Sequence, residues 1–487
     1  MAFDDLRQYL SELQKRNLLI TLEGVDPAEI GALTEIVLTR AKDPYEKPLI
    51  HFKNIQGYSQ DYSLLSELTA LNSVFRNAIG YPPNVRGIDL VSGIRSKLKT
   101  HAPIPPREVS TAPVMQNKIT GNQIDVTRFP APKWHELDGG NYIGTADLVV
   151  TKDPDTGYVN CGTYRVQVHS KNRVTCYMSP GKHGRIIREK YWARGEKCPI
   201  ALVLGLEPSL LEASGAYVGW GNTEYDYAGW LRGEAVELVK LPITGLPVPA
   251  NSEIVFEGFS SPPNEESLPE GPFGENSGYY ASGARNESAV AIEAVYHRDN
   301  PIVTGSLATK ASVHNPWSHM LMRSAMIWDE LERAGIPDIK GVYIFPSYAA
   351  GFIAVSIKQR YGGHSKHTLL QALSSKSAMY HARYVVAVDD DIDPSNMNDV
   401  IWAISTRCVP EKSIDIIRNC WSTYLDPSIE PERKAARDLT KSVALIDACR
   451  PYYWIDKYPP TAVATPKFRR EVEQKWRSKI DSWLGNQ

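Results

Sequence analysis

The feature that most constrains the fold is a change in the spacing of apolar residues near residue 313. Between residues 143 and 310, short apolar runs alternate with turn residues, which is the pattern of successive β-strands. After residue 313, strand-like runs alternate with segments of helical periodicity, which predicts an α/β domain with some parallel strand pairing. The strands expected before the change are Ala146–Thr151, Thr163–His169, Val174–Met178, Ala201–Leu204, Glu253–Glu257, Ala289–Tyr296 and Pro301–Gly305.

A third region precedes these two. Prolines and polar residues gather between Ala102 and Pro132, which indicates a crossover between domains. Before it, Asp26-Pro27 has the N-cap and first-turn proline of a helix, flanked by strand-like runs. The expected fold class is α/β (α+β). Its three expected domains are a small N-terminal α/β unit at 1–106, a β-rich, split-barrel-like domain at 107–312, and a C-terminal α/β domain with a terminal helix at 313–487.

Charge and composition exclude several classes of function. The formal net charge of −2 gives no electrostatic reason to expect a nucleic-acid or membrane partner. The N-terminus lacks the basic and apolar regions of a signal peptide, and no apolar run reaches the roughly 18 residues that span a bilayer. The six cysteines form no Cys-x-x-Cys pair, so neither a zinc knuckle nor a disulfide framework is indicated. A cytoplasmic protein is expected.

The most informative segment is Glu270-Gly271-Pro272-Phe273-Gly274-Glu275. Its Gly-Pro-x-Gly turn can fold back and bring two carboxyl groups into one cleft. Because two like charges at close range oppose each other, one carboxyl can hold a proton for delivery near neutral pH. An exposed acidic loop is the alternative interpretation, and Glu265 and Glu266 nearby favour it.

Three further segments contain residues suited to ligand binding. Asn160 and Arg165 flank the start of an expected strand, where an arginine can orient a carboxylate pair or clamp a substrate carboxylate. His183 lies in a glycine-rich loop before a helix expected to start near Ile186. Glu224 follows a run of small residues that would let backbone groups approach an anion closely. Taken singly, each segment fits a solvated surface as well.

Two lysines, Lys366 and Lys376, lie on or near an expected helix and could contact a phosphate group. A solvated helix face is the alternative. The acidic run Asp389-Asp390-Asp391 ends an expected strand, where acidic turns are common, and is interpreted as structural.

Taken together, these segments resemble the UbiD family of decarboxylases over about residues 5–480. The family's Asn-x4-Arg pattern is met by Asn160 and Arg165, its ligand histidine by His183, and its Ser/Thr-Glu segment by Thr223-Glu224. The Glu-Gly-Pro-(Phe/Tyr)-Gly-(Glu/Asp) signature is met in full by residues 270–275, and residues 400–407 are also similar. Loss of CO2 from an unsaturated carbon requires an electron sink that no side chain supplies. The resemblance implies that prenylated FMN supplies it, held by Mn²⁺ with K⁺ nearby.

The resemblance also implies roles for individual residues. Glu270 would protonate the carbon that loses CO2, Arg165 would orient that glutamate and tune its ionisation, and Glu275 would support the pair. The implied Mn²⁺ ligands are Asn160, His183 and Glu224, an oxygen and nitrogen set that suits this ion. The implied K⁺ site uses Cys161, Ala213, Ser214, Ala216 and Glu224. The implied cofactor contacts are Asn160, Gly162, Thr163, Tyr164, Arg165, Lys182, His183, Ser214, Gly215, Ala216 and Glu224, with Lys376 or Lys366 at the phosphate.

The sequence departs from the cinnamic acid decarboxylase branch in ways that bear on the substrate. Lys182 stands where that branch has Gln, Asn276 stands where Met is usual, and Cys420-Trp421-Ser422 replace part of its apolar pocket wall. These changes favour a hydroxybenzoate, or a pyrrole, furan or indole carboxylate. The residues expected around the substrate are Asn276, His314, Trp317 and Trp421.

The expected function is the reversible, non-oxidative decarboxylation of an aromatic or heteroaromatic acid, with release of CO2. A flavin prenyltransferase would supply the cofactor, and the resemblance implies a homo-oligomer, dimer or hexamer, assembled through the C-terminal domain. Three alternatives stay open. They are a decarboxylase of α,β-unsaturated acids, a plain FMN-binding oxidoreductase, and a non-catalytic assembly or cofactor-storage protein.

Overall fold

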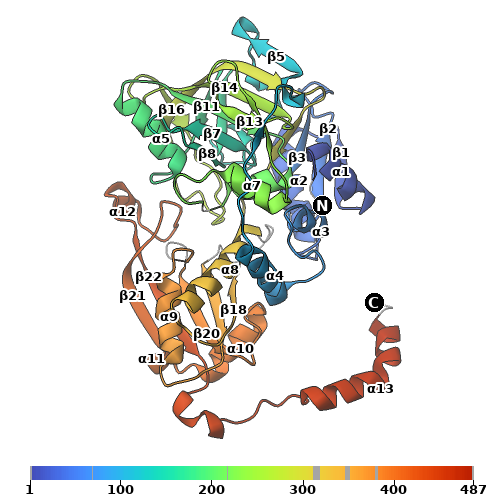
Figure 1. The fold of residues 1–487 in the computed structure, drawn as a ribbon, viewed down its shortest axis with the longest axis vertical. Coiled ribbons are helices and arrows are strands. Elements are labelled where there is room, and N and C mark those ends of the chain that lie inside the picture. The colour runs from blue at the N-terminus through green and yellow to red at the C-terminus, as the bar shows by residue number, and fades with distance from the viewer. Residues whose placement is uncertain are drawn as a thin grey trace.

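The computed structural model describes residues 3–68, 70–216, 218–310, 318–345, 351–378 and 382–484. Figure 1 shows an upper body built from the N-terminal and middle segments and a lower body built from the C-terminal segment. A long helix, α13 (Pro466–Leu484), extends away from both. Among the described residues, no helix is both long and apolar enough to cross a membrane.

The N-terminal segment forms a four-stranded sheet in the order β1-β2-β3-β17. Its strands are β1 (Leu19–Glu23), β2 (Leu49–Lys53), β3 (Ser63–Ser66) and β17 (Ile302–Gly305), and its helices are α1 (Leu6–Lys15), α2 (Ile30–Arg40) and α3 (Ser73–Ala78). Strand β17 comes from the end of the middle segment and pairs parallel with β3. The N-terminal sheet therefore takes one strand from beyond the expected boundary at residue 106.

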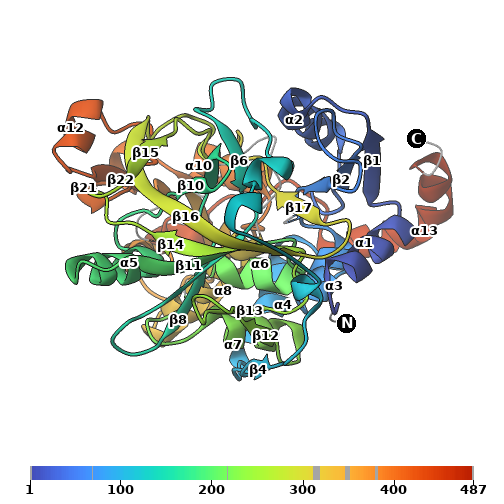
Figure 2. The ribbon, with the colours of Figure 1, turned by 90° about the horizontal axis from the view of Figure 1, so that it is seen from above.

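A ten-stranded sheet forms the middle of the molecule, with the order β6-β9-β10-β16-β14-β11-β7-β8 and with β5 and β15 also pairing with β16. Its strands are β5 (Asn117–Thr120), β6 (Asn141–Gly144), β7 (Leu148–Lys152), β8 (Val159–Gly162), β9 (Val166–Ser170), β10 (Arg173–Cys176), β11 (Cys198–Leu204), β14 (Ile254–Ser260), β15 (Ser267–Glu270) and β16 (Arg285–His297). The long strand β16 crosses the centre of this sheet (Figure 2).

The mixed α/β fold class is confirmed, but the middle sheet does not close into a barrel in the described part of the chain. Its terminal strands β6 and β8 pair only with β9 and β7. Alternating side chains on one face of the sheet, such as Val149, Leu202 and Phe256, form part of a buried apolar core. Register therefore decides which residues of each strand are buried and which reach the site.

Helices α5 (His183–Ala193), α6 (Pro208–Ser214) and α7 (Glu224–Arg232) pack beside this sheet. A small sheet of β4 (Arg107–Glu108), β12 (Glu237–Lys240) and β13 (Pro247–Pro249) lies nearby. Helix α5 begins at His183 rather than near Ile186, because the extended residue Lys182 caps it and the amide of Ile186 already donates to the Lys182 carbonyl. His183 and Glu224 are thus each the first residue of a helix.

The C-terminal body is a five-stranded sheet in the order β18-β19-β20-β22-β21. The expected parallel pairing is confirmed for β19-β20 and β20-β22, and the edge strands β18 and β21 are antiparallel. Its elements are α8 (Ser318–Arg333), β18 (Ile339–Ile344), β19 (Phe352–Ile357), α9 (His364–Ser374), β20 (Tyr384–Asp389), α10 (Met397–Arg407), α11 (Pro410–Ser413), β21 (Ile414–Trp421), α12 (Pro431–Ala435) and β22 (Thr440–Ala448). Helix α4 (Gly87–Lys99), from the N-terminal segment, packs against α8 and β18.

Candidate active site

Three charged side chains from separate parts of the chain meet beside the middle sheet. Glu270 is the last residue of β15, Glu275 follows the next turn, and Arg165 lies between β8 and β9. Arg165 Nε donates to Glu270 Oε1 at 2.6 Å, and its Nη2 donates to Oε2 at 2.9 Å. Arg165 Nη1 donates to Glu275 Oε1. The strand expected to contain Arg165 begins one residue later, at Val166, so Arg165 lies in a loop from which it reaches both carboxylates.

The turn between the two glutamates is held by close backbone contacts. Gly271 has φ +81°, and a Cβ there would lie 2.8 Å from the carbonyl oxygen of Gly283. A Cβ on Gly139 would lie 1.9 Å from the carbonyl oxygen of Gly271, and the Gly139 amide donates to the Pro272 carbonyl at 2.7 Å. Glycine is therefore required on both sides of this contact, which directs Glu275 back toward Glu270.

The three charged side chains are buried beside aromatic rings. Glu270 is 0% exposed and Glu275 7% exposed. The guanidinium of Arg165 lies 4.6 Å from the ring centre of Tyr177 and 5.0 Å from that of Phe273. Burial opposes the charge of Arg165, but its hydrogen bonds to Glu270 and the charge of Glu275 outweigh burial and raise the pKa of the guanidinium. The arginine therefore stays charged and compensates the two carboxylates.

The two carboxylates differ in their hydrogen bonds. Glu270 accepts two bonds from Arg165 and lies within 3.2 Å of the Tyr142 hydroxyl, so both of its oxygens are occupied. Glu275 accepts from Arg165 and from the Ser282 hydroxyl at 3.0 Å, both through Oε1. Among the described residues, none donates to Glu275 Oε2. Glu275 therefore retains an oxygen that can exchange a proton with a bound molecule.

A second cluster forms around the side chain of Tyr158. Asn160 Nδ2 donates to Glu224 Oε1 at 2.9 Å, and the amide of Cys161 donates to Glu224 Oε2 at 2.8 Å. The Tyr158 hydroxyl lies 3.2 Å from His183 Nδ1. Burial raises the pKa of Tyr158, the charge of Glu224 raises it further, and a hydrogen bond with Asn160 opposes both. The three residues expected to bind metal therefore converge on one phenol.

The donor atoms of this cluster fit a hard divalent cation. Asn160 Oδ1 is buried and has no hydrogen-bond partner among the described residues, so this oxygen is available to coordinate a cation. Burial raises the pKa of Glu224 to about 7, a penalty that a cation would offset. The described residues contain no group of three or more His, Cys, Asp and Glu that could hold a metal ion. A metal site here must therefore include the amide of Asn160.

Positive charges flank His183. Burial lowers the pKa of His183, and the charges of Lys182 and Lys376 lower it further. Both lysines thus lie close enough to act on the imidazole, whereas Lys366 forms an ion pair with Asp415. An anionic group bound beside His183 would meet Lys376 rather than Lys366.

The small-residue segment at the end of α6 adjoins the same region. The hydroxyls of Ser214 and Thr163 lie 2.5 Å apart, and the Ala216 amide donates to the Ala213 carbonyl at 3.0 Å. Gly162, Thr163 and Tyr164 lie on the chain that links Asn160 to Arg165. Five residue steps span at most about 17 Å of extended chain. The cluster of Arg165, Glu270 and Glu275, here called the acid–arginine cluster, therefore lies close to the Tyr158 cluster.

A cavity of about 360 Å³ opens beside this segment. Gly215, Ala216 and Thr223 line one side of it, and residues of α4 and α8 line the other. Glu212 also lines the cavity, accepts a hydrogen bond from Ser318, and has its pKa raised to about 7 by burial.

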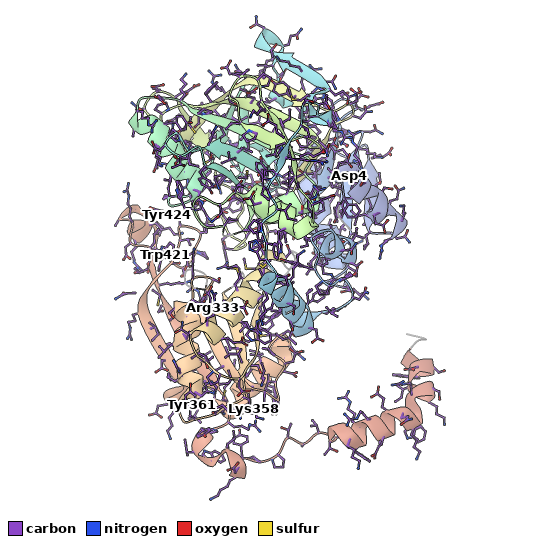
Figure 3. All side chains as sticks on the ribbon, viewed as in Figure 1. Asp4, Arg333, Lys358, Tyr361, Trp421 and Tyr424 are labelled. Carbon is purple, nitrogen blue, oxygen red and sulfur yellow. The ribbon has the colours of Figure 1, made fainter. Side chains whose placement is uncertain are left out.

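Two of the four residues expected around the substrate lie among the described residues. Asn276 is exposed, next to Glu275. Trp421 ends β21 and is 58% exposed, and Figure 3 shows it on the part of the C-terminal body nearest the upper body. His314 and Trp317 lie outside the described residues, so this set stays a prediction.

Five polar residues of the site were not found from the sequence: Tyr142, Tyr158, Tyr177, Ser282 and Arg285. Tyr158 stands two residues before Asn160, so a period of two could have placed both on one strand face. Arg285 lies opposite Glu270 in the β15–β16 pairing. Only the strand register reveals that neighbour, because the two residues are 15 positions apart in sequence.

Two protein-family models match the chain. Residues 107–311 match the model of the 3-octaprenyl-4-hydroxybenzoate carboxy-lyase Rift-related domain, and residues 317–448 match that of the C-terminal domain of the same enzymes. The chain is 30% identical over 501 residues to a phenolic acid decarboxylase of Sedimentibacter hydroxybenzoicus, covering 100% of this chain and 99% of that one. It is also 30% identical over 436 residues to a pyrrole-2-carboxylic acid decarboxylase of Pseudomonas aeruginosa, covering 83% of each chain.

A similar solved structure is that of the UbiD-class enzyme HmfF from Pelotomaculum thermopropionicum. In complex with FMN, its TM-score is 0.82 at 28% identity, over 96% of this chain and 98% of that one. An evolved dimeric form in complex with prFMN has a TM-score of 0.78 at 27% identity, over 95% of this chain and 97% of that one. Because the two family models together match most of the chain and a relative aligns along its whole length, the chain belongs to the UbiD family of carboxy-lyases.

Proposed function

We propose that this chain is a prenylated-FMN-dependent decarboxylase of an aromatic or heteroaromatic carboxylic acid. The observation that carries the proposal is the buried Arg165-Glu270-Glu275 cluster, joined by one short segment to the Asn160-His183-Glu224 donor set. A proton-handling acid and a cation site are the two elements that this reaction requires of the protein.

Asn160, His183 and Glu224 would hold Mn²⁺, and Lys182 and Lys376 would neutralise the phosphate of the cofactor. The K⁺ site would use Cys161, Ala213, Ser214, Ala216 and Glu224. When bound, the prenylated flavin supplies the electron sink that stabilises the carbon as CO2 leaves. The protein supplies orientation, exclusion of water and the proton.

We assign proton delivery to Glu275 and orientation to Arg165 and Glu270. Glu270 would act as a fixed carboxylate, because two bonds from Arg165 and the Tyr142 hydroxyl occupy its oxygens. Glu275 has an oxygen without a described donor, so it can release a proton to the carbon that has lost CO2 and accept one in the reverse direction. This assignment exchanges the roles that the family resemblance implied for the two glutamates.

The substrate class rests on the relatives and on the departures from the cinnamic acid branch. A hydroxybenzoate, or a pyrrole, furan or indole carboxylate, is the proposed substrate, and an acrylic-type acid is the alternative. Two carboxylates beside the cofactor argue against a plain FMN oxidoreductase, because hydride transfer requires no such acid.

The proposed assembly is a homo-oligomer, dimer or hexamer. Helix α13 supports it, because Phe468, Val472, Trp476, Ile480 and Trp483 recur on one face at helical spacing and are each at least 39% exposed. Mass photometry that finds only a 54 kDa species would contradict this part of the proposal. A flavin prenyltransferase is the proposed supplier of the cofactor.

The test uses protein co-expressed with a flavin prenyltransferase and a panel of aryl and acrylic acids. We expect CO2 release and exchange of the product's ring proton with D2O for at least one aryl acid. Glu275→Gln should lose both activities by at least about 100-fold, the usual contribution of acid catalysis, while retaining the flavin absorbance. Full turnover by Glu275→Gln, or turnover of cinnamate alone, would refute the proposal.

A further inference from the structure

The segment that follows the turn between Glu270 and Glu275 is held by hydrogen bonds to two neighbouring carbonyl groups. Lys434 Nζ, from α12 of the C-terminal body, donates to the Ala281 carbonyl at 2.8 Å. Arg285 Nη2 donates to the next carbonyl, that of Ser282, at 2.6 Å. Between these two bonds, the Ser282 hydroxyl donates to Glu275 Oε1 at 3.0 Å. Figure 1 shows α12 at the edge of the lower body that faces the upper body, and Figure 2 shows it next to β15.

Arg285 is itself fixed by the acid–arginine cluster. Its Nη1 donates to the Tyr177 hydroxyl at 2.9 Å, and its guanidinium lies 4.4 Å from the centre of the Tyr177 ring. The guanidinium of Arg165 lies 4.6 Å from the centre of the same Tyr177 ring. Arg285 Nε also lies 4.0 Å from Glu270 Oε2. The position of Ser282 is therefore set by the same network that holds the two glutamates.

Ser282 lies between the acid and solvent. Glu275 is 7% exposed, Ser282 is half-buried, and the next two residues, Gly283 and Ala284, are exposed. A glutamate that gives up its proton in each turnover must regain one, and a bound substrate would cover the side of Glu275 that faces the reaction. The hydroxyl of Ser282 offers a hydrogen-bonded route on the other side.

We propose that Ser282 is a positioning residue that relays a solvent proton to Glu275 after each turnover, with Lys434 and Arg285 holding it in place. The inference rests on the proposed function of Glu275. The Ser282 O–H bond breaks as its proton passes to Glu275 Oε1, and the serine oxygen takes a proton from water, which leaves hydroxide to the solvent. A half-turn about the soft terminal torsion of Glu275 then presents the protonated oxygen to the substrate.

The relay separates the first turnover from those that follow. In Ser282→Ala, a Glu275 that is already protonated should deliver its proton at the wild-type rate, so the single-turnover rate constant stays unchanged. Glu275 must then regain its proton directly from water, and we expect kcat to fall by about tenfold. This fall is smaller than that expected for Glu275→Gln. KM and flavin content should stay at wild-type values. Ser282→Thr keeps a hydroxyl and should stay within about twofold of wild-type kcat.

The experiment measures single-turnover and steady-state rates of the holoenzyme, on the acid that the panel identifies as best. A small buffer acid added at rising concentration should raise kcat of Ser282→Ala but not of wild type. Lys434→Ala removes the bond to the Ala281 carbonyl but keeps the Ser282 hydroxyl, and it should lower kcat by a smaller factor than Ser282→Ala does.

Two outcomes would overturn the relay. One is an unchanged kcat in Ser282→Ala, and the other is an equal fall in its single-turnover and steady-state rates, which would make Ser282 merely structural. If Glu275→Gln retains full turnover, the proposed function fails instead. An inactive Glu275→Gln beside a fully active Ser282→Ala would refute the relay alone.

Discussion

Replacing Arg165 by methionine should lower the free energy of unfolding more than the removal of any charge at the surface. The side chains of Arg165, Glu270 and Glu275 are 8%, 0% and 9% exposed, so solvent screens their interaction little. Methionine keeps much of the apolar length of arginine but removes the cation that hydrogen-bonds both buried carboxylates, and it leaves only Arg285, 4.0 Å from Glu270 Oε2. Removing one partner of a buried ion pair costs about 3–5 kcal/mol, and we expect a loss of that size in the free energy of unfolding.

Urea unfolding followed by tryptophan fluorescence measures the loss. The matched control is Arg86→Met, because Arg86 pairs with Asp43 at the surface, with the two side chains 54% and 37% exposed. An exposed pair contributes about 0–1 kcal/mol, so the control should unfold close to wild type. The double variant Arg165→Met with Glu270→Gln should recover about 2 kcal/mol, since it removes one of the stranded charges.

An Arg165→Met variant that unfolds at the same urea concentration as wild type would refute this reasoning. It would mean that the two carboxylates are compensated in some other way. A double variant no more stable than Arg165→Met would show that the stranded charge of Glu270 is not the source of the loss.

Three further outcomes follow from the geometry. Gly271→Ala should lower the free energy of unfolding by about 2–3 kcal/mol and remove most of the activity, because Gly271 has a positive φ and a close carbonyl contact. The control is Gly283→Ala, where φ is +63° but no atom lies within 4 Å of the added Cβ, and thermal unfolding should show a loss of about 1 kcal/mol. Burial raises the pKa of Glu212 to about 7 in the folded state, so this group favours folding less as pH rises from about 4.5 to 7. Glu212→Gln should therefore be about 3 kcal/mol more stable than wild type at pH 8 and close to it at pH 4.5; no difference at pH 8 would contradict this. Lys376→Ala should weaken FMN binding, measured by flavin fluorescence, at least about tenfold more than Lys366→Ala; equal effects would exclude Lys376 as the phosphate contact.

The sequence alone predicted much of the local structure. The strand expected at Pro301–Gly305 is β17 (Ile302–Gly305), and the expected terminal helix is α13 (Pro466–Leu484). The strands expected at Ala201–Leu204 and Ala289–Tyr296 lie within β11 and β16. These elements depend on the period of apolar residues and on local turn chemistry, both of which can be read from neighbouring positions. The residue types of the acid–arginine cluster were found in the same way.

Tertiary structure decided what depends on register and on contacts between distant segments. The pairing of β15 with β16 places Arg285 opposite Glu270, and the pairing of β17 with β3 carries the end of the middle segment into the N-terminal sheet. Which glutamate keeps an unoccupied oxygen depends on Tyr142, which is 128 positions from Glu270, and on Ser282, which lies in the turn before β16. Local spacing fixes the element and the kind of residue, whereas a hydrogen-bond partner is fixed only when separate segments pack together in one register.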